Sequence, residues 1–312
     1  MEISHVNKAF KWLEAIIASP RHWRGASMEC REFGKTGYKL PLFGMGTYYD
    51  PGWIVAAKLL RMKPRSDMHL KAINTGLDQG INFIDTAEIY GTEPLVAKAL
   101  SGRKRDDIFI ATKVWRSNLD YDSVIKACNG SLKNLQTSYI DLYQIHFPNK
   151  RVKISETMRA MEYLVKEGKI RYIGISNFSL RQMLDAEEAL KANELASTQM
   201  PYSLVDRKLE KEILPHCRDE KISILAYYPL GHGKLGSENA SLSAEVADIS
   251  RNHGGKSLSQ IALNWFYSKH ENVFPIPRAA NPLHVIENVG SVGWTLSADE
   301  ISRLEGAISS AK

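Results

Sequence analysis

The chain has 312 residues, of which 44% are hydrophobic and 24% charged, and its formal net charge is +6. This balance is typical of a globular protein with a large core. The lysines and arginines form no clustered tract, which argues against nucleic-acid binding, and no apolar run approaches the ~20 residues of a membrane-spanning helix. Cys30, Cys128 and Cys217 are too few and too far apart for a zinc site or a disulfide framework. We therefore expect a reducing, cytoplasmic setting and no membrane or nucleic-acid partner.

The first 28 residues differ from the rest of the chain. A short amphipathic segment, with apolar side chains at positions 10, 13, 16 and 17, is followed by a basic stretch that Pro20 interrupts. A secretory signal needs a longer apolar core, and an organellar targeting peptide normally lacks acids such as Glu2 and Glu14. We interpret residues 1–28 as an extension, either an accessory helix or a start site placed too early, and residues 29–312 as one domain.

From residue 42 onward, short β-rich runs alternate with helical patterns. The expected strands are 42–46, 81–85, 108–113, 140–146, 170–176, 197–200, 222–227 and 273–277. The expected helices are 67–79, 93–100, 122–135, 155–166, 180–192, 209–220, 257–268 and 282–289, with an inserted helix at 243–252 and a closing helix at 297–307. Because no linker rich in proline, glycine or serine divides these repeats, the pattern predicts an α/β fold, a single (β/α)8 TIM barrel rather than a doubly wound open sheet.

Ionisable side chains end several of the predicted strands. The stretch at 80–91, GINFIDTAEIYG, ends its apolar run in Asp85 and continues into a loop that carries Tyr90. The runs IFIATKVW and YIDLYQIHF contain Lys113 and His146 at the corresponding places. In a barrel of this kind the catalytic groups gather at the C-terminal ends of the strands, so we expect these four side chains to lie together.

The four residues together predict a site that handles a proton. A phenol with a pKa of about 10 is a poor acid unless a nearby cation favours its ionised form. Lys113 is the candidate cation, Asp85 would hold the ammonium in place, and His146 would add a second hydrogen-bond donor. Tyr90 is then expected to protonate an oxygen on which negative charge develops, as it does on a carbonyl that receives a hydride.

Each of these residues also has a structural explanation when taken alone. Asp85 can cap a turn, Lys113 can be a surface lysine, His146 can be a hydrogen-bonded core histidine, and Tyr90 can serve packing. Their joint placement on successive strand ends favours catalysis. A lyase that uses Lys113 as a Schiff-base nucleophile is an alternative reading. A metal site is not expected, because no third ligand accompanies Asp85 and His146 at a suitable spacing.

Several motifs in order give the chain a family resemblance. These are GINFIDTAEIYG, IFIATKVW, DLYQIHF, GKIRYIGISNF, AYYPLG and IPRAANPLHVIENVG. In this order and spacing they resemble the aldo-keto reductase superfamily, over residues 29 to about 306. The resemblance implies reduction of aldehydes or ketones to alcohols by hydride transfer from nicotinamide C4 on a TIM barrel. It matches Asp85, Tyr90, Lys113 and His146 to the catalytic tetrad, with Tyr90 as the proton donor.

The resemblance also implies where the cofactor binds. It assigns Ser176, Asn177 and Gln199 to the nicotinamide carboxamide, Tyr227 to stacking on the nicotinamide ring, and Arg278 to a 2′-phosphate. The implied cofactor residues are Gly46, Thr47, Asp85, Ser176, Asn177, Gln199, Tyr227, Pro229, Leu230, Gly231, Arg278, Asn281, Glu287 and Asn288. Arg278 favours NADPH, while His284 and Ala279 depart from the arginine and serine common in NADP-preferring members, which leaves NADH open.

The substrate site is expected among variable loops. Tyr48, Tyr49 and Trp115 suggest an aromatic lining for a small-molecule carbonyl compound, and the short stretch after the last predicted helix suggests an open site. An alternative function within the same superfamily is a nicotinamide-binding regulatory subunit, similar to potassium-channel β subunits, that couples cofactor binding to a membrane partner. Turnover of a simple aldehyde without any partner distinguishes the enzyme from the regulatory subunit.

Overall fold

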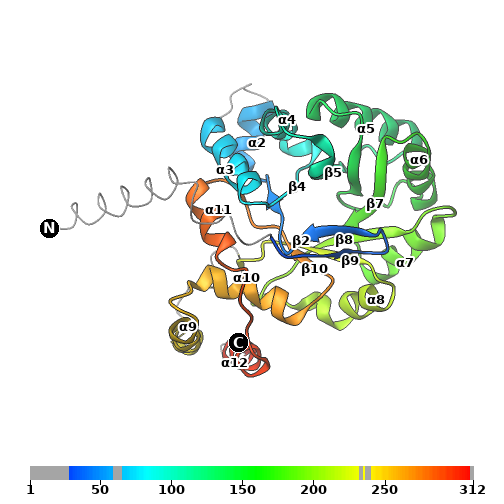
Figure 1. Ribbon diagram of the computed structural model, residues 1–312. Helices are drawn as coiled ribbons and strands as arrows, with labels where there is room; N and C mark the ends of the chain where they lie inside the picture. The colour runs from blue at the N-terminus through cyan, green and yellow to red at the C-terminus, as the bar shows by residue number, and fades with distance from the viewer. Residues whose placement is uncertain (1–27, 59–64, 232–234, 236–239, 310–312) are drawn as a thin grey trace.

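A closed barrel of parallel strands forms the centre of the molecule. The computed structural model describes residues 28–58, 65–231, 235 and 240–309 (Figure 1). The strands are β3 (Met45–Gly46), β4 (Phe83–Asp85), β5 (Phe109–Val114), β6 (Ile140–Ile145), β7 (Ile170–Ser176), β8 (Leu195–Pro201), β9 (Ser223–Tyr227) and β10 (Val273–Pro275), hydrogen-bonded in this order. A parallel bridge between Gly46 and Arg278 joins the first strand to the segment after the last. The backbone amide of Gly46 donates to Pro277 at 2.9 Å, so the sheet closes on itself.

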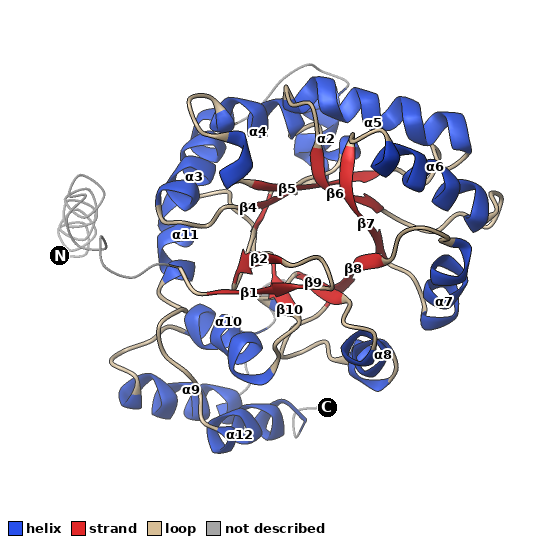
Figure 2. Ribbon diagram, turned by 45° about the vertical axis from the view of Figure 1, so that its right-hand side comes forward, coloured by secondary structure: helices blue, strands red, loops and turns tan. Residues whose placement is uncertain are grey.

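Helices surround the ring of strands, as Figure 2 shows. They are α2 (Pro51–Lys58), α3 (Ser66–Asp78), α4 (Glu93–Leu100), α5 (Tyr121–Leu135), α6 (Ile154–Lys166), α7 (Leu180–Ala189), α8 (Ile213–Asp219), α10 (Leu258–Lys269) and α11 (Pro282–Val289). Two further helices, α9 (Ala240–Asn252) and α12 (Ala298–Ser309), pack against each other outside this ring. The predicted (β/α)8 barrel is confirmed, with the inserted and closing helices present.

Local sequence signals explain where several helices begin. Ser179 and Ser257 each form a capping box with a glutamine three residues later, which satisfies free backbone amides at the starts of α7 and α10. Asp120 caps α5 by accepting a hydrogen bond from Ser123 at 3.0 Å. These caps fix the first turns, and the apolar faces of the helices then bury against the sheet.

The strands β5 and β6 are buried at every position. The sequences of such strands are mostly apolar, because helices cover one face of the strand and the barrel interior covers the other. Against this background the fully buried Lys113 in β5 is an exception. A buried cation is costly unless it is paired, so it marks a place where the surroundings must provide a partner.

An N-terminal hairpin, absent from the sequence-based prediction, covers one end of the barrel. β1 (Cys30–Phe33) pairs antiparallel with β2 (Tyr38–Pro41). Phe33 is fully buried, with its ring centroid 5.3 Å from that of Phe109 and 6.0 Å from that of Phe274. The hairpin therefore fills the N-terminal end of the barrel, which leaves the C-terminal ends of the strands as the open side.

Other differences from the prediction concern boundaries. The first expected strand, 42–46, is reduced to Met45–Gly46, because the Leu42 amide instead donates to Glu29, at 3.1 Å. The helix expected at 209–220 is divided into a short 3-10 turn, Lys208–Lys211, and α8, and helix α2 was not predicted. Residues 1–27 of the expected extension lie outside the described residues.

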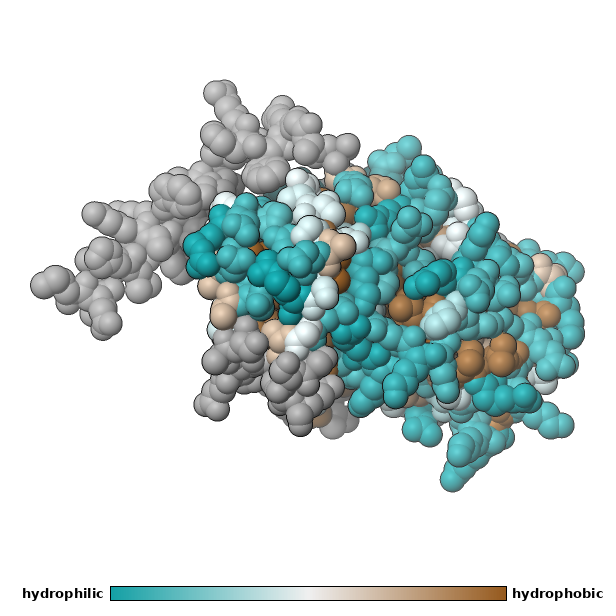
Figure 3. Space-filling model, turned by 90° about the horizontal axis from the view of Figure 1, so that it is seen from below, coloured by the Kyte–Doolittle hydropathy of each residue, from teal (hydrophilic) through white to brown (hydrophobic). Residues whose placement is uncertain are grey.

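The face of the molecule in Figure 3 gives little sign of apolar association. The face in Figure 3 is mainly hydrophilic, with small separate apolar patches. In the part of the chain that the structure describes, no helix has both the length and the apolar character needed to span a bilayer.

Candidate active site

A buried ion pair lies at the C-terminal edge of the barrel. Lys113 Nζ donates to Asp85 Oδ1 at 2.7 Å and to the carbonyl oxygen of Thr86 at 2.7 Å. The Lys113 side chain is fully buried, and Asp85 is 3% exposed. Burial lowers the pKa of Lys113, and the carboxylate of Asp85 opposes that shift. The pair forms because the neighbouring parallel strands β4 and β5 end at the same edge of the barrel.

Two glutamines from across the barrel hold the other oxygen of Asp85. Gln199 Nε2, from β8, donates to Asp85 Oδ2 at 2.9 Å, and Gln144 Nε2, from β6, donates at 3.4 Å. The carboxylate is therefore bound on both sides, by Lys113 and by the amides. This arrangement fixes the direction in which the ammonium points.

Tyr90 lies in a short 3-10 turn, Glu88–Tyr90, directly after β4. Its hydroxyl lies 3.2 Å from Nε2 of His146, and the Lys113 ammonium lies 5.1 Å from the centroid of its ring. Burial, with the negative charge of Asp85 as the next cause, raises the pKa of Tyr90 well above its ordinary value. The expectation that Lys113 lowers this pKa is not met, because burial and the charge of Asp85 raise it, and the phenol stays protonated.

The imidazole of His146 is neutral. Burial lowers the pKa of His146 to about 2, and the positive charge of Lys113 acts in the same direction. The edge of the Trp115 ring approaches the imidazole with a centroid distance of 5.2 Å, and Phe147 stacks on it at 5.1 Å. Because a neutral imidazole has one donor and one acceptor nitrogen, Nε2 can exchange a hydrogen bond with the Tyr90 hydroxyl in either tautomer.

A cavity of about 1040 Å³ opens beside these groups. It extends from Tyr90 and His146 to Arg278 and helix α11. The residues predicted for the site that line it are Gly46, Tyr49, Asp85, Tyr90, Trp115, His146, Ser176, Asn177, Gln199, Tyr227, Pro229, Leu230, Arg278, Glu287 and Asn288. Tyr48, expected beside Tyr49, also lines it and has its ring centroid 5.1 Å from that of Tyr90.

Four predicted site residues lie outside this lining. Lys113 is behind Tyr90 and acts on the cavity only through its neighbours. The hydroxyl of Thr47 is buried in hydrogen bonds to the Asp85 carbonyl, at 3.1 Å, and to Thr92, at 3.0 Å. Gly231 adopts a φ of 64°, where an added Cβ would lie 2.7 Å from Val205. Asn281 caps α11 by accepting from the Leu283 amide at 3.0 Å.

The prediction omitted other residues that line the cavity. They are Asp50, Pro51, Ile54, Ile89, Phe147, Tyr228, Ser259, Ile276 and Pro277, whereas His284, which the sequence places where NADP-preferring members often have an arginine, also lines it. Most lie in loops or in the unpredicted helix α2, where no periodic pattern marks a residue as facing the cavity. Phe147 was detectable, because it directly follows His146 in the chain.

A chain of hydrogen bonds orders the polar side chains at the ends of β7 and β9. Tyr227 donates to Asn177 Oδ1 at 2.7 Å, and Asn177 Nδ2 contacts Ser176 Oγ at 3.0 Å and the His146 carbonyl at 2.9 Å. Asn177 has a φ of 62°, a left-handed conformation that asparagine tolerates better than most residues. The Gln199 amide oxygen accepts no hydrogen bond from the described residues. These side chains are therefore positioned by one another before any ligand binds.

The end of the cavity at Arg278 is cationic. The exposed Arg278 donates from one guanidinium nitrogen to the carbonyl of Tyr49 at 2.5 Å. Helix α11 begins beside it, with its partially positive N-terminal end. Glu287, by contrast, accepts a hydrogen bond from Ser257 at 2.7 Å. A cavity with aromatic and amide groups near Tyr90 and a cation near helix α11 fits a nicotinamide dinucleotide.

Comparison with known proteins agrees with this geometry. The model of the Aldo/keto reductase family matches residues 58–309. Methylglyoxal reductase YeaE of Escherichia coli is 33% identical, covering 86% of this chain and 91% of its own length. Glyoxal reductase of Bacillus subtilis is 32% identical, covering 86% and 89%.

Solved structures show the same relationship. A crystal structure of an aldo-keto reductase from Klebsiella pneumoniae in complex with NADPH has a TM-score of 0.79 and 29% identity, and the match covers 90% of this chain and 95% of that one. The chain therefore belongs to the aldo/keto reductase family of NAD(P)H-dependent oxidoreductases that act on carbonyl groups.

Proposed function

We propose that this chain reduces aldehydes and ketones to alcohols with NADPH, and that Tyr90 is the general acid. The observation that supports this most strongly is the hydroxyl of Tyr90, which borders the cavity and lies 3.2 Å from the neutral imidazole of His146. The paired Lys113 ammonium stands 5.1 Å from the same ring. A protonated phenol, a neutral imidazole and a fixed cation together suit a site where an oxygen gains negative charge.

Tyr90 and its neighbours have separate roles in this proposal. The raised pKa of Tyr90 keeps its proton in place until the carbonyl oxygen becomes basic enough to take it. His146 donates to or accepts from the same hydroxyl and so orients it. The positive charge of Lys113 stabilises the phenolate that Tyr90 becomes, and Asp85 with Gln199 holds that charge in position. These groups act on the transition state more than on the bound substrate.

When bound, NADPH would supply the hydride, from C4 of its nicotinamide. Ser176, Asn177 and Gln199 would hold the carboxamide, with the open amide oxygen of Gln199 as an acceptor. Tyr227 would lie against the ring, held by its hydrogen bond to Asn177. Pro229 and Leu230 would border the pyrophosphate.

Arg278 supports a preference for NADPH over NADH. Arg278 is exposed and lines the cavity, and its guanidinium makes one hydrogen bond within the described part of the chain, so donors remain for a 2′-phosphate. His284 lines the same end and supplies a second polar group there. The Klebsiella pneumoniae relative was solved in complex with NADPH, which agrees with this assignment.

Small dicarbonyl compounds are the first substrates to test. Two of the similar proteins, those of Escherichia coli and Bacillus subtilis, are named for methylglyoxal and glyoxal. The lining of Tyr48, Tyr49 and Trp115 beside Tyr90 supports a compact substrate with an exposed carbonyl.

The experiment measures NADPH consumption with methylglyoxal, for the parent protein and for Tyr90→Phe. We expect the substitution to reduce kcat by about 10²- to 10⁴-fold while the Kd for NADPH stays the same. Equal turnover by Tyr90→Phe would contradict the acid assignment. Turnover of methylglyoxal without any partner protein would also separate this function from that of a regulatory subunit.

A further inference from the structure

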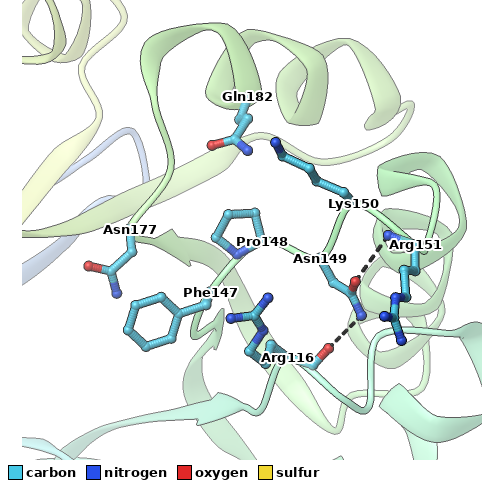
Figure 4. A pocket seen from close by; sticks show the side chains of 8 residues that line it. All are labelled: Arg116, Phe147, Pro148, Asn149, Lys150, Arg151, Asn177 and Gln182. Carbon is cyan, nitrogen blue, oxygen red and sulfur yellow. Dashed lines mark hydrogen bonds between the residues drawn. The ribbon is translucent and has the colours of Figure 1, made fainter.

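A second cavity, of about 460 Å³, lies beside the active-site cavity. The two cavities share Phe147 and Asn177 as lining residues, so they are neighbours at the C-terminal ends of β6 and β7. Figure 4 shows the side chains that line the second one, which we call the side cavity. Since Phe147 directly follows His146, a substrate whose carbonyl lies at His146 can extend toward the side cavity.

The side cavity combines an apolar wall with cations. Phe147 and Pro148 form the apolar part. In Figure 4 the Arg116 guanidinium lies beside Phe147, and the Lys150 ammonium points toward Gln182. Arg151 also contributes to the lining, but its side chain points away from Phe147.

Its charge is not compensated nearby. None of the described residues that line the side cavity is acidic. Within the described part of the chain, neither Arg116 nor Lys150 has a carboxylate within the 4.0 Å that defines an ion pair. An exposed cation is commonly only solvated, but two uncompensated cations beside an active site, with no acid in the lining, produce a positive potential where a substrate enters.

A hydrogen-bonded asparagine fixes the two cationic loops to each other. Asn149 Nδ2 donates to the Arg116 carbonyl at 2.9 Å, and Asn149 Oδ1 accepts from the Arg151 amide at 3.0 Å. The loop after β5, which carries Arg116, is thereby joined to the loop after β6, which carries Lys150. The cations thus belong to a connected structure beside the active site.

We propose that the side cavity binds an anionic group, a carboxylate or a phosphate, on the end of the substrate opposite the reacting carbonyl. This rests on the proposed carbonyl reduction and adds a substrate class to it. Arg116 offers a planar pair of donors that matches either anion, and Lys150 adds a point charge. Phe147 and Pro148 contact the carbon chain between the two ends. Methylglyoxal and glyoxal carry no such group, so neither would use this cavity.

The test compares charged and uncharged carbonyl compounds of the same length. The first pair is 4-oxobutanoate and butanal, and the second is glyceraldehyde 3-phosphate and glyceraldehyde. Within each protein the measured quantity is the ratio of kcat/KM for the anionic compound to that for the neutral one. Longer ω-oxocarboxylates then show which spacing between carbonyl and carboxylate suits the site. The first pair reports on a carboxylate, and the second on a phosphate.

The variants are Arg116→Gln and Lys150→Gln, with Lys153→Gln as the matched control. Lys153 is an exposed cation three positions from Lys150, outside both cavity linings. We expect the parent to prefer at least one of the anionic compounds, and each cavity variant to lower that ratio by about fivefold to tenfold. Lys153→Gln should leave the ratio within about twofold of the parent, because an exposed charge outside the site is largely screened.

Two results would overturn the proposal. One is a parent protein that shows no preference for either anion. The other is a ratio that stays the same in both cavity variants, or falls equally in Lys153→Gln, which would indicate a general surface potential. In each case turnover of butanal would leave the proposed carbonyl reduction intact. A parent protein that reduces none of the carbonyl compounds would instead refute the reduction itself.

Discussion

The ammonium of Lys113 lies 5.1 Å from the centroid of the Tyr90 ring and donates hydrogen bonds to Asp85 and to the carbonyl of Thr86. The hydroxyl of Tyr90 has His146 as its hydrogen-bond partner instead. The cation is therefore close enough to stabilise a phenolate once it forms, but it does not offset the burial that keeps the phenol protonated. This relationship determines how turnover should depend on pH.

We expect kcat/KM for carbonyl reduction to remain constant from pH 7 to beyond pH 10. A general acid works below its pKa, and burial raises the pKa of Tyr90 well above the ordinary 10. Because the pKa of His146 is lowered to about 2, kcat/KM should also show no change near 6.5, the ordinary pKa of histidine. A pH profile measured with methylglyoxal checks both points. A decline centred near pH 6.5 would show that His146 titrates during turnover.

Lys113→Met should destabilise the protein by about 3–5 kcal/mol, because it leaves the buried carboxylate of Asp85 without its cation. The double variant Asp85→Asn with Lys113→Met removes both charges and should recover a large part of that loss. Urea unfolding measures the free energy of unfolding in each case. Carbonyl reduction should stay low in both variants, since the charge beside Tyr90 is absent. Full recovery of turnover in the double variant would mean that Lys113 serves folding alone.

Arg278→Gln should weaken NADPH binding by about tenfold or more and NADH binding far less. Glutamine keeps an amide donor for the Tyr49 carbonyl, so the loop contact survives while the positive charge is lost. Charge-assisted hydrogen bonds to a phosphate contribute roughly 1.5–3 kcal/mol. Fluorescence titration with each cofactor gives the two Kd values. Arg65→Gln, an exposed arginine outside the cavity lining, is the control, and equal losses for both cofactors in Arg278→Gln would reject the 2′-phosphate assignment.

Asp141→Asn should lower the free energy of unfolding by about 3–5 kcal/mol. Asp141 is 1% exposed and accepts hydrogen bonds from Arg105 at 2.7 Å, from Arg171 at 3.0 Å and from the Ile110 amide at 2.9 Å. The substitution leaves both arginines without their shared carboxylate. Asp107→Asn removes an exposed carboxylate 3.7 Å from Lys104 and should cost about 0–1 kcal/mol. Similar losses in the two variants, measured by urea unfolding, would contradict the importance of burial.

Stability should fall as the pH drops below 6.5, in part because of His270. Burial lowers the pKa of His270 to about 3 in the folded protein, so the unfolded chain binds a proton between that value and the ordinary 6.5 while the folded protein does not. Each pH unit in this window costs about 1.4 kcal/mol. His270→Gln, which retains a polar partner for the hydroxyl of Tyr202, should reduce that slope, whereas His146 keeps its own contribution. An unchanged slope of unfolding free energy against pH would exclude His270.

The strands that carry Asp85 and Lys113, and the strand that ends just before His146, were predictable because each is a local apolar run with an ionisable residue at or near its end. Burial by helices on one face and by the barrel interior on the other produces such runs directly. The hairpin of β1 and β2 was not predicted, because its strands are short and Phe33 gains its apolar contacts from Phe109 and Phe274, far away in the sequence. The loop residue Tyr228, which also lines the cavity, was missed for a related reason.

By itself the sequence determined the family, the order of strands and helices, and which side chains carry the proposed chemistry, since these depend on local patterns and on matched motifs. Only the tertiary structure decided how Asp85 is held by glutamines from across the barrel, that Tyr90 keeps its proton, and that two cationic loops meet beside the active site. The physical reason is that hydrogen bonds, burial and electrostatic fields depend on distances between residues remote in the chain, and folding sets those distances.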